Sequence, residues 1–117
     1  MTQTPPPAPV SEEELRNITD AIVRAVDPVC VILFGSRASG TARADSDVDL
    51  LIVEDRPFGP ERSRLEEIGR IMRSLIGFLV PIDVLVYSQE EIDRWRGSRH
   101  HIVGRALREG RMLHGHA

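Results

Sequence analysis

Three aspartates interrupt apolar segments of this chain, where a folded core would not accept a charge. Asp47 and Asp49 open the apolar run 47–53, and Asp83 lies inside the run 81–86. Because an unpaired buried carboxylate is costly, we expect these side chains at an open edge of the fold. Alternate residues of a strand share a face, so Asp47 and Asp49 point the same way. A divalent cation relieves the repulsion between crowded carboxylates, and Mg²⁺ prefers oxygen ligands.

A glycine and a serine end the preceding apolar run. Gly35 and Ser36 follow it directly, and ten residues separate Ser36 from Asp47. Glycine lets the backbone approach a phosphate closely, and N–H groups at a following helix start favour anions. The Ser36 hydroxyl can donate to a phosphate oxygen, while Arg37 and Arg43 can screen its charge. With the three aspartates, this turn predicts a site for a metal-bound nucleoside triphosphate and phosphoryl or nucleotidyl transfer.

Hydrophobic periodicity predicts the elements that must position these residues. Serine caps followed by acidic residues mark two helix starts, at Ser11 and Ser88. Helices are predicted over 11–26, 61–77, the segment after Ser88 and 102–109. A short helical turn is predicted over 36–40. Strands are predicted over 29–34, 47–54, 81–87 and 111–114. This order predicts an α/β (α+β) domain, with a small mixed β-sheet and helices packed mainly on one face. Residues 1–10 are expected to form a flexible Pro-rich tail, and 11–117 a single domain.

Composition narrows the functional class. The 117 residues carry a net charge of −3, so we expect no stable DNA binding. All 15 basic residues are arginines, which excludes a lysine nucleophile. The lone Cys30 rules out an internal disulfide and is expected to be buried. Neither a membrane span nor a signal peptide is visible, so we expect a cytoplasmic protein.

The spaced motif resembles that of the minimal nucleotidyltransferase (MNT) branch of the polymerase-β-like superfamily. The residues that carry the resemblance are Gly35, Ser36, Asp47, Val48, Asp49 and Asp83. The similarity covers roughly residues 11–114. It implies the polymerase-β-like nucleotidyltransferase fold, a nucleoside triphosphate that is usually ATP, and two Mg²⁺ ions held by the three aspartates. It further implies phosphate contacts from Gly35 and Ser36.

The small size of the chain bears on the acceptor. Larger members of the superfamily carry a second domain that binds the acceptor, and 117 residues leave no room for one. We therefore expect a second polypeptide or a second copy of the chain to supply it. The resemblance implies a HEPN-type partner: in such pairs the HEPN chain can be an RNase toxin, and the MNT chain an antitoxin that transfers AMP to a hydroxyl group of it. Asp83 would help to deprotonate that hydroxyl.

Two other functions stay open on the sequence. One is a non-catalytic, nucleotide-binding antitoxin that neutralises its partner by occlusion. The other is a small-molecule nucleotidyltransferase of the aminoglycoside-modifying kind. His100 and His101 are adjacent and point different ways, so they do not indicate a shared metal site. Trp95, between two arginines, is expected to be a partly buried anchor or a partner contact rather than a platform for a base.

Overall fold

The computed structural model describes residues 10–39 and 47–116. The helices are α1 (Glu12–Val26), α2 (Ser36–Ser39), α3 (Arg64–Ser74), α4 (Gln89–Trp95) and α5 (Ile102–Glu109), and the strands are β1 (Cys30–Phe34), β2 (Val48–Glu54), β3 (Ile82–Ser88) and β4 (Arg111–Gly115). Each predicted element within these residues is present, with ends that differ by at most three residues. Most of the predicted tail, and the predicted loop over 41–46, lie outside the described residues.

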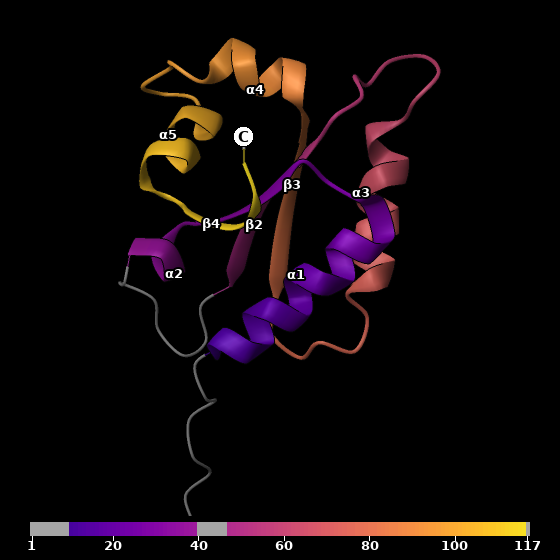
Figure 1. Cartoon of the computed structure of the whole chain (residues 1–117), viewed down its shortest axis with the longest axis vertical. Helices are drawn as coiled ribbons and strands as arrows, with labels where there is room; N and C mark the ends of the chain where they lie inside the picture. Colours follow the sequence, from indigo (N-terminus) through magenta and orange to yellow (C-terminus); the bar gives the residue numbers. More distant parts are fainter. Residues whose placement is uncertain (1–9, 40–46, 117) are drawn as a thin grey trace, which may run out of the picture.

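The four strands form one mixed sheet in the order β3-β2-β1-β4 (Figure 1). β1 is antiparallel to both β2 and β4, while β2 and β3 are parallel. The parallel pair is possible because α3 carries the chain back between the two strands, as a crossover connection must. The predicted mixed sheet is therefore confirmed. β2, which carries Asp49, lies between β1 and β3, and β3 carries Asp83.

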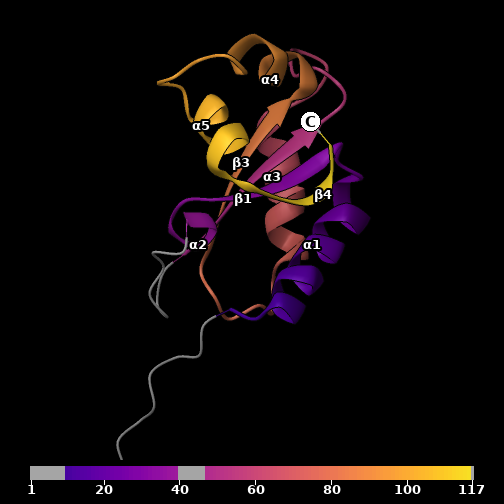
Figure 2. The same cartoon turned by 60° about the vertical axis from the view of Figure 1, so that its left-hand side comes forward.

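Helices cover the two faces of the sheet unequally (Figure 2). The two longest helices, α1 and α3, pack on one face against side chains of β1 and β2. The shorter α4 and α5 pack on the other face, through Ile92, Val103 and Ala106. The expectation of helices mainly on one face thus holds for the long helices, whereas α4 and α5 shield part of the second face. They cover Leu51 and Val53 in the second half of β2.

Capping serines set the starts of the helices. The Ser11 and Ser88 hydroxyls accept hydrogen bonds from the backbone N–H groups of Glu14 and Glu91, as predicted. Ser63 caps α3 in the same way, which is why this helix starts three residues later than predicted. None of the helices in the described ranges is long and apolar enough to cross a membrane.

Candidate functional site

Strand pairing brings two of the three aspartates side by side. Asp49 of β2 is in register with Asp83 of the parallel β3 and with Phe34 of the antiparallel β1. Asp49 lies two residues before Leu51, which packs under α4 and α5, so its side chain points to the same face of the sheet. The helices cover the second half of β2 and leave the row at its start uncovered. Asp49 is half-buried and Asp83 is exposed.

Asp47 joins this row from the segment just before β2. A hydrogen bond from Val48 N–H to the Pro81 carbonyl, 2.9 Å long, ties the starts of β2 and β3 together. Asp47 is exposed, and its carboxyl group lies close enough to that of Asp83 to raise the pKa of Asp83. The structure therefore brings all three predicted aspartates together. We call Asp47, Asp49 and Asp83 the carboxylate row.

Gly35 closes the other side of the carboxylate row. Its φ is +76°, a conformation that side chains rarely adopt. A Cβ atom on Gly35 would lie 2.5 Å from Oδ2 of Asp49, which is far inside van der Waals contact. Glycine is thus required here twice, by the turn and by the closeness of the carboxylate. The backbone of the predicted phosphate-binding turn lies directly against Asp49.

Each carboxyl group of the row makes the charged form of its neighbours less favourable. The pKa of Asp49 is raised, first by burial and then by the neighbouring charges of Asp83 and Asp47. The pKa of Asp83 is also raised, chiefly by its hydrogen bond with Asp47 and then by burial and charge repulsion. A cation placed among these oxygens would remove the repulsion, because it favours the charged form of each group.

The donor set of the row fits a divalent ion that keeps part of its water shell. In the described ranges, no three His, Cys, Asp or Glu side chains are spaced as a ready-made metal cage. Mg²⁺ does not require such a cage, since it usually binds through one or two carboxylates together with waters and substrate phosphates. Oxygen ligands that lie at an exposed strand end, next to an open glycine turn, suit that mode of binding.

Two of the remaining predicted site residues, Ser36 and Arg37, follow the glycine turn directly. Ser36 begins α2, one residue after Gly35, and α2 packs against β1. Arg37 follows in α2 and is half-buried. Arg43 lies outside the described residues, so its prediction stays a prediction. The packing of Gly35 against Asp49 could not be predicted from spacing alone, because it depends on which strands pair.

The aromatic and histidine residues set aside on sequence grounds have structural contacts. Nδ1 of His101 accepts a hydrogen bond from Val103 N–H and caps α5. The His101 ring stacks on Trp95, with 4.3 Å between centroids, and meets Tyr87 edge-on at 5.9 Å. Trp95 remains 38% exposed, which agrees with the expected partly buried anchor. Cys30 is buried, as predicted.

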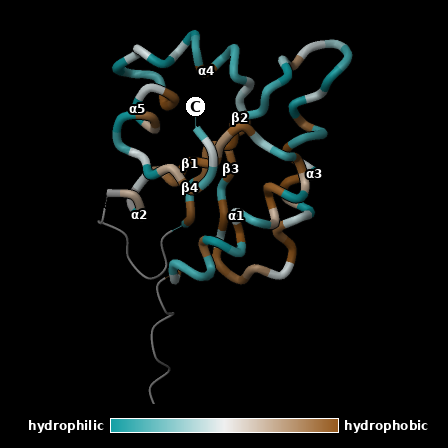
Figure 3. Tube along the Cα trace, in the orientation of Figure 1, coloured by the Kyte–Doolittle hydropathy of each residue, from teal (hydrophilic) through white to brown (hydrophobic). Residues whose placement is uncertain are grey.

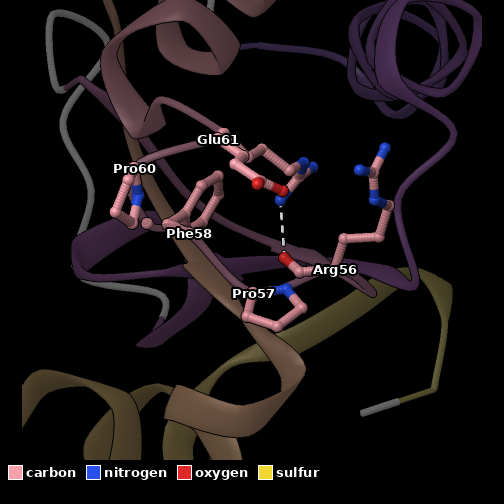
Figure 4. A pocket seen from close by; sticks show the side chains of 7 residues that line it. Arg56, Pro57, Phe58, Pro60 and Glu61 are labelled. Carbon is pink, nitrogen blue, oxygen red and sulfur yellow. Dashed lines mark hydrogen bonds between the residues drawn. The ribbon is translucent and has the colours of Figure 1, made fainter.

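A cavity of about 410 Å³ lies next to the loop that follows β2 (Figure 4). Residues 56–62, in the connection that follows β2, line it. Arg62 holds this loop: its guanidinium donates to the Arg56 carbonyl and to the Glu54 carboxylate, each at 2.5 Å. The row stands at the start of β2 and this cavity beyond its end, so the cavity does not belong to the candidate site.

Comparison with protein families gives one match, which spans nearly all of the described elements. The model for the nucleotidyltransferase domain matches residues 13–111, from α1 to the first residue of β4. The match therefore includes the glycine turn and the whole carboxylate row. A comparison with curated proteins finds no match.

Two solved structures share the fold. A protein from Sulfolobus solfataricus assigned as a nucleotidyltransferase superposes with a TM-score of 0.51 and 26% identity, over 68% of this chain and 68% of that chain. A chain from a toxin–antitoxin structure solved with AMP-PNP superposes with a TM-score of 0.52 and 19% identity, over 86% of this chain and 73% of that chain. Because its sequence identity is only 19%, the match to the toxin–antitoxin chain shows a shared fold and nothing more.

Proposed function

Because the chain belongs to the nucleotidyltransferase domain family, we propose that it transfers AMP from ATP to a hydroxyl group of a partner protein. The partner is a HEPN-type toxin, and the transfer neutralises it in the cytoplasm. The fold shared with a chain from a toxin–antitoxin structure supports a role of this kind. The observation that carries the proposal is the uncovered carboxylate row packed against the Gly35 turn.

The carboxylate row is the catalytic centre in this proposal. Asp47, Asp49 and Asp83 would hold two Mg²⁺ ions, which would supply positive charge to neutralise the triphosphate and the developing charge of the transfer. The acceptor oxygen bonds to the α-phosphorus, the bond between the α- and β-phosphates breaks, and pyrophosphate leaves. Asp83 accepts the hydroxyl proton because it is the exposed member of the parallel pair.

The glycine turn and its neighbours hold the triphosphate. The backbone at Gly35 approaches the phosphates closely because no Cβ intervenes. Ser36 donates to a phosphate oxygen, and Arg37 and Arg43 balance the remaining charge. The open first half of the sheet face admits the acceptor from the same side as the row.

The test is AMP transfer followed by intact mass. The purified chain is incubated with ATP, Mg²⁺ and the protein encoded by the adjacent gene, and the partner is weighed. We expect the partner to gain one or more AMP units. Asp49→Asn should lower the transfer rate at least about a hundredfold, equivalent to about 3 kcal/mol of transition-state stabilisation. Asp20→Asn, the same change on an exposed position of α1, is the matched control.

Three results would contradict parts of the proposal. Full transfer by Asp49→Asn would remove the carboxylate row from the chemistry. A stable complex that silences the partner without a gain in mass would assign neutralisation by occlusion. AMP transfer to a small aminoglycoside-type acceptor by the isolated chain would assign the third function left open by the sequence.

A further inference from the structure

The outward face of α3 and the connection that follows it expose large apolar side chains. Leu65 is 78% exposed, Met72 41%, Ile76 80% and Leu79 99%. Leu65, Gly69 and Met72 lie within α3 at intervals of four and three residues, the spacing of a coiled-coil contact, whereas Ile76 and Leu79 follow the end of the helix at Ser74. We call residues 65, 69, 72, 76 and 79 the α3 seam. The same apolar character continues from the end of α3 into the turn toward β3 (Figure 3).

The monomer's own core does not use this seam. α3 packs inward through other residues, with Ile71 and Leu75 buried and Ile68 partly buried. Soluble monomers seldom expose several large apolar side chains along one line, and such a line usually marks an interaction surface.

Gly69, in the middle of the seam, is not required by the fold of the monomer. Its φ is not positive, and a Cβ there would meet only the mobile end of Arg73, whose Nη1 would lie 3.2 Å away. A glycine inside a helix destabilises it relative to alanine. A second helix that approaches closely at this point requires a small residue, which explains the glycine.

Two opposite charges flank the seam on one side. Glu66 and Arg73 are both exposed, and neither has an ion-pair partner among the described residues. They are seven residues apart, so they occupy equivalent positions beside the seam, two turns from one another. The seam therefore has an acidic and a basic end on the same flank.

We propose that the α3 seam is the contact between two copies of this chain, with their α3 helices antiparallel. In this register Gly69 of each helix lies opposite Met72 of the other, so the small residue receives the large one. Leu65 lies opposite the turn that follows the other helix, where Ile76 is exposed. The same register brings Glu66 beside Arg73 of the second copy, twice by symmetry. A parallel pair would place these charges beside Ile68 and Leu75, which face the core.

The position of the seam favours a second copy over an acceptor protein. α1 and α3 cover one face of the sheet, whereas the carboxylate row lies on the opposite face (Figures 1 and 2). A protein docked on α3 would not reach the row, while two chains joined through α3 leave both rows open. The dimer therefore does not depend on the proposed transfer reaction.

The contact is small. It is centred on one helix of 11 residues, and a standard protein interface covers about 800 Å² per partner. We therefore expect a reversible dimer that dissociates in the micromolar range, so that the distribution between monomer and dimer changes with concentration.

The test is sedimentation velocity of the full chain from low to high micromolar concentration. We expect Glu66→Arg and Arg73→Glu each to weaken the dimer at least about tenfold, because each places like charges together twice. The double variant Glu66→Arg/Arg73→Glu should restore the dimer, because it exchanges the two signs. Ile76→Glu should abolish it, and Arg24→Glu, a charge reversal on an exposed position of α1, should have no effect. Circular dichroism of each variant checks that the chain stays folded.

The inference is overturned by any of three results. They are a wild-type chain that stays monomeric over the whole range, a dimer that the seam variants leave unchanged, and a folded double variant that fails to recover association. Asp49→Asn serves as a further control. If this variant still forms the dimer but does not transfer AMP, dimer formation and AMP transfer are shown to be independent, so either proposal can fail without the other.

Discussion

Among the candidate site residues, Gly35 should tolerate substitution least. We expect Gly35→Ala to lower stability by about 1–2 kcal/mol, because alanine at a φ of +76° is strained. It should also impair AMP transfer, because the new Cβ displaces the Asp49 carboxylate. Urea denaturation and the transfer assay measure the two effects.

A second glycine provides the control for this prediction. Gly59→Ala places a Cβ where nothing lies within 4 Å, and its φ is not positive. It should change neither stability nor transfer. If the two alanine variants have the same stability and the same transfer rate, the close approach of Gly35 to Asp49 does not affect function.

Glu54 is a buried carboxyl group that contributes a pH dependence to stability. Burial, followed by the neighbouring Glu67 carboxyl, raises its pKa from 4.5 to about 7, although Arg62 opposes the shift. Its Oε2 has no hydrogen-bond partner in the described part of the chain. The folded chain therefore holds a proton that the unfolded chain releases between pH 4.5 and 7. Stability from this group is present below pH 4.5 and is lost as the pH rises through about 7.

Glu54→Gln should remove this dependence. Relative to the variant, the wild-type free energy of unfolding should fall by up to about 3 kcal/mol as the pH rises across that window. Urea denaturation at several pH values measures the difference between the two proteins. A difference that stays constant with pH would mean that Glu54 titrates normally.

At the scale of elements, Glu91 joins two helices on different faces of the sheet. It completes the capping box of α4 with Ser88, and it receives two hydrogen bonds from Arg64 at the start of α3, at 2.6 and 3.0 Å. We expect Glu91→Ala to destabilise the chain by about 1–3 kcal/mol, because a cap and a two-point ion pair are lost together. Thermal and urea unfolding measure the loss.

The neighbouring residue is a matched control for Glu91. Glu90 lies in the same first turn but is exposed and reaches Arg94 only at 3.4 Å. Glu90→Ala should cost less than about 0.5 kcal/mol. Equal losses in the two variants would show that α4 and α3 are not coupled through Glu91.

At the scale of the whole molecule, ligand binding should stabilise the fold. A non-hydrolysable ATP analogue with Mg²⁺, at about ten times its dissociation constant, adds about 1.4 kcal/mol to the folded state. For a chain of 117 residues that raises the melting temperature by about 6 °C. EDTA, or the substitution Asp49→Asn, should abolish the increase, whereas Asp20→Asn should retain it. An equal increase in Asp49→Asn would place the nucleotide elsewhere.

Local pattern was enough to predict the elements, and it singled out three aspartates that the fold then brings together. Strand and helix periods are properties of neighbours along the chain, so the elements were predicted to within a few residues. The three aspartates stood out because a charge inside an apolar run must find an open edge. The roles assigned to the three aspartates, Gly35, Ser36, Arg37 and Arg43 all stay predictions.

Tertiary structure decided which distant residues meet, because strand order depends on the packing of the whole sheet. The placement of β2 between β1 and β3 puts Asp49 against Gly35 and beside Asp83. The cover of α4 and α5 over the second half of that face leaves the row open. The burial of Glu54 and the exposed α3 seam likewise follow from long-range packing. Spacing along the chain carries no information on which apolar face will remain uncovered.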